Sequence, residues 1–351
     1  MMKISIGLLF GGASEEHIVS INSARAILQA LQIGNNLCKY NVIPIYIQRN
    51  GVWISGKIAE QVLQTKQALP LVLLKKEEKF QLWQFPTEVN QIDVWFPVLH
   101  GPNGEDGTIQ GLLKMMQTPF VGTSVLGSAI GMDKIVMKTI FSQAGFPQVK
   151  YLTLEYSKLF SNAQYYSQLC NDIRTNLGYP CFIKPANLGS SVGVSKVSSH
   201  DELEIALKNA ASYDNRIIIE EGIIARELEC GVLGNDIPKA SVVGEITFES
   251  DFYDYKAKYK DTSSKIHIPA QLPNHIIEKI QQMAINAFTT INGRGLSRVD
   301  FFYIEGTQKI FINEINSFPG FTESSMYPEL WIKTGLEFHE LVDKLIELAL
   351  K

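Results

Sequence analysis

The stretch FIKPANLGSSVGV, at residues 182–194 of this 351-residue chain, combines a lysine with a loop of small residues. An apolar run ends at Lys184, passes through a loop of small residues and returns to an apolar run. Glycine and serine let backbone N–H groups approach phosphate oxygens closely, and the lysine adds a point charge for the same anion. No helix begins directly after the glycines, so the loop differs from the P-loop and from the dinucleotide-binding motif. A flexible hairpin turn has the same composition, and this stretch alone leaves both interpretations open.

A second polar pattern lies in SRVDF at 297–301 and FINEINS at 311–317. Because strand side chains alternate, Arg298 shares a face with Asp300, and Glu314 shares a face with Asn316. Val299, Phe301, Ile312 and Ile315 are then expected on the core side.

The turn between these two strands decides whether the carboxylates meet. If Gly306–Gln308 form the turn, with Glu305 opposite Lys309, Asp300 pairs directly with Glu314. Two carboxylates and an amide oxygen would suit Mg²⁺ or Mn²⁺. A one-residue slip would separate the carboxylates, and a solvated hairpin face would explain the same residues.

Three further motifs are polar. GGASEEH at 11–17 and HGPNGEDG at 100–107 follow apolar runs, where helix starts and tight turns use the same residues. YDYKAKYK at 253–260 places three tyrosines and three lysines in a long polar loop, and such loops usually act as lids or are disordered. Lysines, a metal cluster and a lid together indicate phosphoryl-transfer chemistry.

The composition argues against nucleic-acid-binding, disulfide-bonded and membrane proteins. There are 32 Lys+Arg against 36 Asp+Glu, so we expect no nucleic-acid partner. The four cysteines form no C-x-x-C pair, which favours reduced thiols in the cytoplasm. No apolar run reaches the length of a membrane span, and no membrane association is expected.

Hydrophobic periodicity predicts an α/β (α+β mixed) protein with a parallel sheet in its first part. The expected strands are 3–10, 41–48, 92–98, 181–185, 191–197, 216–221, 227–234, 240–248, 295–304 and 309–316. The expected helices are 16–31, 108–116, 124–131, 133–144, 201–212, 275–291 and 336–350. Short strands at 51–55 and 80–85 are expected around a helix.

These motifs, in this order and over nearly the whole chain, resemble the D-alanine–D-alanine ligase family of ATP-grasp enzymes. The family patterns G-G-x-S-x-E-[HR]-x-V-S, H-G-x-x-G-E-D-G and M-D-K correspond to 11–20, 100–107 and 132–134. The resemblance implies three domains: a substrate domain at 1–122, a central domain with the phosphate loop at 123–222, and a C-terminal domain with lid and metal site at 223–351. It implies ATP-dependent ligation of two D-alanines through an acyl phosphate, for peptidoglycan synthesis. We expect a cytoplasmic homodimer.

The resemblance also assigns residues to ATP and to the metal. The ATP-binding residues that it implies are Lys134, Lys184, Ser190, Ser191, Glu220, Glu221, Glu227 and Lys258. The lysines would contact phosphates, Glu220 and Glu221 would meet adenine, and Glu227 would bind the ribose. The implied metal ligands are Asp300, Glu314 and Asn316.

Catalytic and substrate-binding roles follow from the same resemblance. The implied catalytic residues are Glu16, Ser190, Tyr259, Arg298 and Gly320, and the implied substrate-binding residues are Glu16, His100, Ser325 and Met326. Glu16 would hold the ammonium of the first D-alanine, and Ser190 would link it to Tyr259 of the lid. Arg298 and the N–H of Gly320 would stabilise the oxyanion.

Three other interpretations fit part of these patterns. A D-alanine–D-lactate ligase would share the scaffold, but Tyr259 argues against it. A glutathione-synthetase-like ligase would have no need of Glu16 or of Ser325 and Met326. A nucleotide-binding protein without catalysis would tolerate loss of Arg298 and the two metal carboxylates, yet all are present.

The lid interpretation of 248–265 gives a first prediction. Proteases cut exposed, mobile loops first, so limited proteolysis of the free protein should cleave within this segment. ATP with a phosphinate mimic of the intermediate should protect it. Equal cleavage with and without these ligands would make the segment an ordinary linker.

Overall fold

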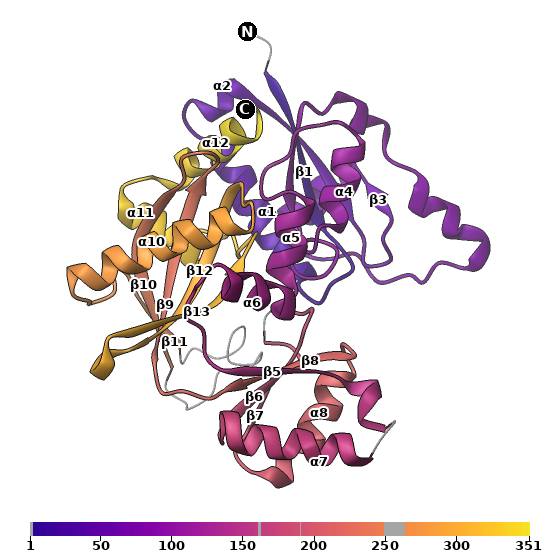
Figure 1. Ribbon diagram of the computed structural model, residues 1–351. Coiled ribbons are helices and arrows are strands. Elements are labelled where there is room, and N and C mark those ends of the chain that lie inside the picture. The colour runs from indigo at the N-terminus through magenta and orange to yellow at the C-terminus, as the bar shows by residue number, and fades with distance from the viewer. Residues whose placement is uncertain (1–2, 161–162, 190, 249–263) are drawn as a thin grey trace.

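In the computed structural model, residues 3–160, 163–189, 191–248 and 264–351 are described, and three β-sheets organise them (Figure 1). Ser190 of the phosphate loop and the lid residues Lys258 and Tyr259 lie outside the described residues. Among those that are described, none of the helices combines the length and the apolar character needed to cross a bilayer.

The first sheet has the strand order β3-β2-β1-β4. Its strands are β1 (Ile4–Gly11), β2 (Tyr40–Ile47), β3 (Trp53–Ile54) and β4 (Val94–Val98), and its helices are α1 (His17–Leu31), α2 (Asn36–Lys39), α3 (Gly56–Thr65) and α4 (Thr108–Met115). β1 pairs in parallel with β2 and β4, which confirms the predicted parallel sheet. Phe10 and Leu9 belong to different apolar clusters, so both faces of β1 are covered, as is typical of parallel sheets.

The second sheet is antiparallel, with the order β5-β8-β6-β7. Its strands are β5 (Tyr151–Glu155), β6 (Cys181–Pro185), β7 (Ser195–Val197) and β8 (Arg216–Glu221). Helices α7 (Ala163–Asp172) and α8 (Leu203–Ala211) lie on one side of it (Figure 1). Ile183 and Ile219 pack into the apolar cluster on that side. Because strand side chains alternate, Lys184 and Glu220 point to the opposite side.

The third sheet has the order β11-β10-β9-β12-β13 and is antiparallel throughout. Its strands are β9 (Arg226–Gly234), β10 (Lys239–Phe248), β11 (Ser264–His267), β12 (Gly295–Ile304) and β13 (Lys309–Asn316). The remaining helices are α5 (Val125–Met132), α6 (Lys134–Gln143), α10 (Asn274–Thr290), α11 (Met326–Thr334) and α12 (Phe338–Ala349). Val299 and Phe301 of β12 pack with α10 in one apolar cluster, so Arg298 and Asp300 lie on the other face.

Several predicted elements differ from the structure in their limits or in their type of secondary structure. Residues 80–85 form no strand but lie at the end of a 3₁₀-helix, Lys76–Trp83, which begins with a reciprocal cap between Lys75 and Glu78. The strand expected at 191–197 begins only at Ser195, because Ser191 and Gly193 have positive φ and form a turn. The missed elements include β5, β11, α7 and α11.

The hairpin of β12 and β13, which carries the predicted metal ligands, has the predicted pairing of Asp300 with Glu314 but a different turn. The turn was predicted wrongly: Ile304, not Glu305, pairs with Lys309. The register then shifts between Phe301 and Asp300, so that Asp300 pairs with Glu314 as predicted. Asn313 is the extra residue of this β-bulge. Bulges re-aim side chains in this way and are frequent beside functional sites.

The C-terminal helix α12 completes the core of the first sheet. Its buried residues Phe338, Leu341 and Leu345 repeat at helical spacing and pack into the same cluster as Phe10 of β1. The end of the chain therefore packs with its beginning, although the predicted limits place it in a domain at 223–351. The limits at 122 and 222 themselves stay predictions.

This packing predicts a stability difference within α12. Leu345 is fully buried, whereas Leu350 is 42% exposed. Leu345→Ala should lower the free energy of unfolding by about 2–5 kcal/mol, because it leaves a cavity in the first core. Leu350→Ala should change it by less than about 0.5 kcal/mol. Urea unfolding followed by tryptophan fluorescence measures both, and similar losses would show that α12 does not stabilise this core.

Candidate active site

The strand register of the second sheet brings a lysine and a glutamate together. Lys184 on β6 pairs with Ile218 of β8, so Glu220 is its diagonal neighbour on the same face. The Lys184 Nζ and Glu220 Oε2 atoms are 2.5 Å apart. Lys138 of α6 reaches the other carboxylate oxygen, with its Nζ 2.9 Å from Oε1. Glu220 therefore holds one lysine on each oxygen.

These charges determine one another's ionisation. Burial alone would raise the pKa of Glu220, but Lys138 and Lys184 outweigh it and lower the pKa to about 2. Burial opposes the charge of Lys184 as well, yet Glu220, and then Glu314 and Glu227, raise its pKa above the ordinary value. Glu220 is thus a carboxylate and Lys184 an ammonium at any physiological pH.

Lys134 connects the second and third sheets. It begins helix α6, directly after Asp133, whose side chain accepts hydrogen bonds from the N–H groups of Ile135 and Val136. The Lys134 Nζ donates to the backbone oxygen of Leu188 at 2.5 Å, inside the predicted phosphate loop. The same Nζ lies 4.0 Å from Glu314 Oε2 on β13. This side chain of α6 therefore joins the predicted phosphate loop to the third sheet.

Arg298 on β12 is fixed between two carboxylates. Its Nε and Nη2 each donate to one oxygen of Asp300 at 2.7 Å, and its Nε lies 2.7 Å from Glu229 Oε2 on the neighbouring strand β9. Burial opposes the charge, but Asp300 and Glu229 raise the pKa of Arg298 well above its ordinary value. The guanidinium is permanently charged and held in one orientation.

The predicted metal ligands lie together on the same face as Arg298. Asp300 is paired with Glu314, and Asn316 Nδ2 donates to Asp300 Oδ2 at 3.1 Å. Rotation of the amide would present its oxygen at the same place. Within the described residues there is no group of three or more His, Cys, Asp or Glu that could hold a metal. Two carboxylates and an amide oxygen nevertheless fit Mg²⁺, which usually completes its octahedron with water and phosphate oxygens.

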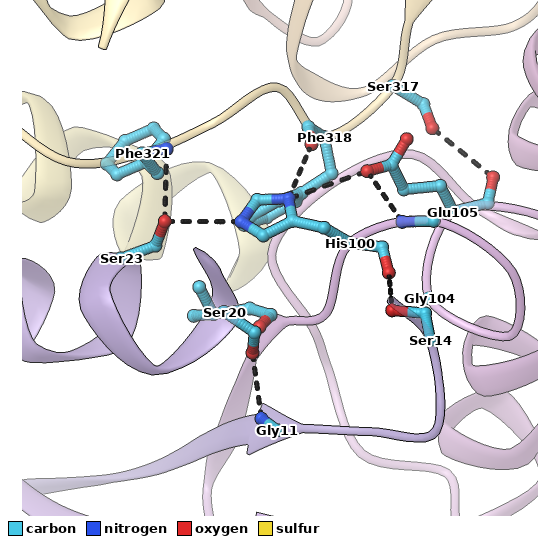
Figure 2. A network of polar contacts seen from close by, with 12 residues as sticks. Gly11, Ser14, Ser20, Ser23, His100, Gly104, Glu105, Ser317, Phe318 and Phe321 are labelled. Atoms are coloured by element: carbon cyan, nitrogen blue, oxygen red, sulfur yellow. Dashed lines mark hydrogen bonds and ion pairs between the residues drawn. The ribbon is translucent and has the colours of Figure 1, made fainter. Parts of the chain in front are cut away.

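A separate polar network joins three loops around His100 (Figure 2). The Nε2 of His100 lies 3.2 Å from Ser23 Oγ on α1, and Nδ1 lies 3.3 Å from the oxygen of Phe318, in the loop after β13. Ser23 Oγ also accepts from the N–H of Phe321 at 3.3 Å. Ser14 Oγ donates to the His100 oxygen at 2.7 Å. The first sheet thereby holds the loop that follows the third sheet.

Glu105 places a carboxylate beside His100 in this network. Its Oε1 lies 3.5 Å from His100 Nδ1 and accepts from the N–H of Gly101 at 3.2 Å. Burial opposes the imidazolium, but the carboxylates of Glu105 and Glu16 outweigh it, so the pKa of His100 is raised. His100 is buried at 3% exposure and so acts inside the loop network.

Glu16 lies where two predicted loops meet. A Cβ added to Gly101 would lie 2.7 Å from Glu16 Oε2, and one added to Gly189 would lie 3.7 Å from it. The carboxylate therefore sits between the loop 100–107 and the phosphate loop. Glycine suits position 101 because its φ is 72°, a conformation that residues with a Cβ rarely adopt.

Gly320 and Ser325 are neighbours in the loop before α11. A Cβ on Gly320 would lie 3.3 Å from Ser325 Oγ. Ser325 is the N-cap of α11, and Met326 is the first helical residue. Backbone N–H groups at a helix N-terminus favour an anionic group.

Comparisons with known proteins show the family to which this chain belongs. Residues 5–123 match the family described as D-ala D-ala ligase N-terminus, and residues 140–347 match the D-ala D-ala ligase C-terminus. A D-alanine–D-alanine ligase of Synechococcus sp. (strain RCC307) is 51% identical over 344 residues, covering 98% of this chain and 97% of the relative. The chain belongs to the D-alanine–D-alanine ligase family.

Solved structures of related ligases share the fold. The VanG D-Ala:D-Ser ligase from Enterococcus faecalis has a TM-score of 0.82 and 36% identity, and covers 99% of this chain and 100% of its own. The D-alanine–D-alanine ligase from Coxiella burnetii has a TM-score of 0.79 and 33% identity, covering 99% and 94%. The mixed α/β, ATP-grasp architecture that the sequence predicted for this family member is thereby confirmed.

Sequence reasoning did not single out several residues that hold the predicted site residues. Lys138, Ser23 and Glu229 are the clearest cases. Lys138 follows Lys134 by four residues, a spacing that places both on one face of α6. That spacing was the available signal; the burial of Lys138 could be known only from the fold.

The contacts of Ser23 lead to a prediction about the polar network around His100. Ser23→Ala would leave the N–H of Phe321 without its acceptor and His100 Nε2 without its partner. We expect turnover to fall about tenfold or more, because the loop carrying Gly320 loses its attachment to α1. Ser128→Ala is the matched control: this serine is also buried and donates to the Thr123 oxygen at 3.0 Å, a bond that includes neither His100 nor Phe321. Steady-state kinetics and melting temperatures of both variants test it. Equal losses of turnover would remove any specific role for Ser23.

Proposed function

We propose that this chain joins two D-alanine molecules into D-alanyl-D-alanine, with conversion of ATP to ADP and phosphate, for peptidoglycan synthesis. Family membership across nearly the whole chain supports an ATP-dependent ligase of this kind. The observation that carries the proposal for the site is the position of Lys134. Its Nζ contacts both the phosphate-loop oxygen of Leu188 and the carboxylate of Glu314.

ATP would bind between the second and third sheets. Lys134, Lys184 and Lys258 would contact the phosphates, with Ser190 and Ser191 of the phosphate loop. Glu220 and Glu221 at the end of β8 would meet the adenine, and Glu227 at the start of β9 would bind the ribose. The charge of Glu227 already raises the pKa of Lys184, which supports placing both beside one ligand.

Asp300, Glu314 and Asn316 would hold Mg²⁺ or Mn²⁺. The ion would supply positive charge to the phosphate oxygens during transfer. Arg298, fixed by Glu229 and Asp300, adds a permanent positive charge on the same face.

The first D-alanine would bind through its ammonium to Glu16, beside the phosphate loop. Its carboxylate attacks the γ-phosphorus, ADP leaves, and an acyl phosphate forms. The amine of the second D-alanine then attacks the acyl carbon, loses a proton, and phosphate leaves. Its carboxylate would meet Ser325 and Met326 at the α11 N-terminus, while Arg298 and the N–H of Gly320 stabilise the oxyanion.

His100 would contribute to substrate binding indirectly, because it holds the loops that carry the proposed substrate-binding residues. Tyr259 would close the site above Ser190 and Glu16. A cytoplasmic location and assembly as a homodimer remain predictions drawn from the family resemblance.

Product analysis tests the function. The purified protein with ATP, Mg²⁺ and D-alanine should release phosphate and form D-alanyl-D-alanine, and it should not do so with L-alanine. Mixtures of D-alanine with D-serine or with D-lactate separate the related activities. Predominant D-alanyl-D-serine or D-alanyl-D-lactate would replace the proposed function by one of these.

Glu314→Gln tests the metal site. The substitution keeps the shape of a half-buried strand residue, so the melting temperature should change little. Turnover should fall by about a hundredfold or more, because one charged ligand is lost, while nucleotide binding without Mg²⁺ survives. Mg²⁺ titrations of activity and of nucleotide binding separate these effects. Wild-type turnover with unchanged Mg²⁺ dependence would show that Glu314 is not a ligand.

A further inference from the structure

Three charged groups are buried together where Lys138 of α6 reaches the second sheet. Lys138 is 1% exposed and Glu220 is 2% exposed, and Lys184 completes the cluster. The Lys138 ammonium also lies 5.6 Å from the ring centre of Tyr151, whose strand position is directly opposite Glu220. A buried lysine is rare and needs a partner, which here is Glu220.

The position of Lys184 creates a problem for phosphate binding. Its Nζ lies 2.5 Å from Glu220 Oε2, so the lysine assigned to phosphate is held by a carboxylate. An ammonium has three N–H donors, so Lys184 can approach a phosphate, but any movement toward the phosphate loosens this ion pair. A buried carboxylate left without a partner costs several kcal/mol, which would be subtracted from the free energy of ATP binding.

Lys138 removes this cost because it pairs with the other oxygen. When Lys184 leaves, Glu220 and Lys138 remain as a neutral, buried pair at 2.9 Å. We infer that Lys138 is a positioning residue that holds Glu220 in place as an ion pair and thereby frees Lys184 for the phosphates of ATP. The inference rests on the proposed ATP-dependent function and assigns no contact between Lys138 and ATP.

A purely structural role would predict something different. If Lys138 only filled space in α6, methionine would replace it, because its unbranched chain has a similar length. The loss in Lys138→Met should then be confined to stability. If Lys138 frees Lys184, the same variant should bind ATP weakly even at temperatures where it is fully folded.

A double-mutant cycle with Lys138→Met, Glu220→Gln and their combination tests the inference. Glutamine keeps a hydrogen-bond acceptor for the adenine but removes the buried negative charge. Titration calorimetry with a non-hydrolysable ATP analogue and Mg²⁺ gives Kd for each protein. Steady-state kinetics give kcat and the KM values for ATP and D-alanine.

We expect Lys138→Met to raise the Kd and KM for ATP about tenfold or more, with the KM for D-alanine within about twofold of wild type. The double variant should recover most of the ATP affinity, since no buried carboxylate is left unpaired. Lys138→Arg, which keeps the charge, should lie close to wild type. Lys208→Met is the matched control, because it removes an exposed ion pair with Glu204 at 2.6 Å and should change neither constant.

Unchanged ATP affinity in folded Lys138→Met would overturn the inference, as would a double variant that binds ATP no better than the single one. These results are independent of the proposed function, which the product analysis of the wild-type protein decides. A wild-type protein that binds the ATP analogue but forms no dipeptide would contradict that function alone.

Discussion

The site depends on the balance of charge between the second and third sheets. Lys184 is held by Glu220 and Arg298 is held by Asp300, so both cations that we propose to contact substrates already have an anionic partner. In the proposed site, ATP would therefore exchange partners with these ion pairs rather than add charge to an uncharged surface. Glu220 keeps Lys138 when Lys184 turns away, and Asp300 gains a divalent cation in the proposed site. Each carboxylate stays compensated, which is the condition for burying it.

Strand alternation made much of this site predictable. It placed Arg298 with Asp300 on one face, and Lys184 at the end of a strand before the phosphate loop. The turn of the metal hairpin was nevertheless predicted one residue wrong, and the bulge restored the pairing of Asp300 with Glu314. The sequence contained a signal for this bulge, because Ile312 and Ile315 are both apolar although they are three residues apart. Both side chains are buried in the structure. Period-2 alternation cannot place both inward unless one extra residue lies between them.

Contacts between segments that are distant in the chain could not be predicted from the sequence. Lys138 has a helical spacing from Lys134, but nothing local indicates that β8 will supply Glu220 to it. Ser23 likewise looks like any small residue on α1 until the loop after β13 brings Phe321 to it. The missed strand β5 lies at an edge of the second sheet, beside β8, and its short run carries a weak pattern. Local pattern predicts elements, whereas these partners are set by packing.

The loop after β13 shows why the parts of the site keep their relative positions. Its strand belongs to the third sheet, yet Phe318 and Phe321 are buried in the core of the first sheet, together with α1 and α12. His100 and Ser23 fix its backbone from the same side. Gly320, between these two anchors, is thus tied to the first sheet, whose β1–α1 loop carries Glu16, while Arg298 is tied to the proposed metal ligand Asp300. Glu16 and Gly320, two of the groups proposed for the alanines, are therefore held by the first sheet, and ATP in the proposed site would lie toward the second sheet.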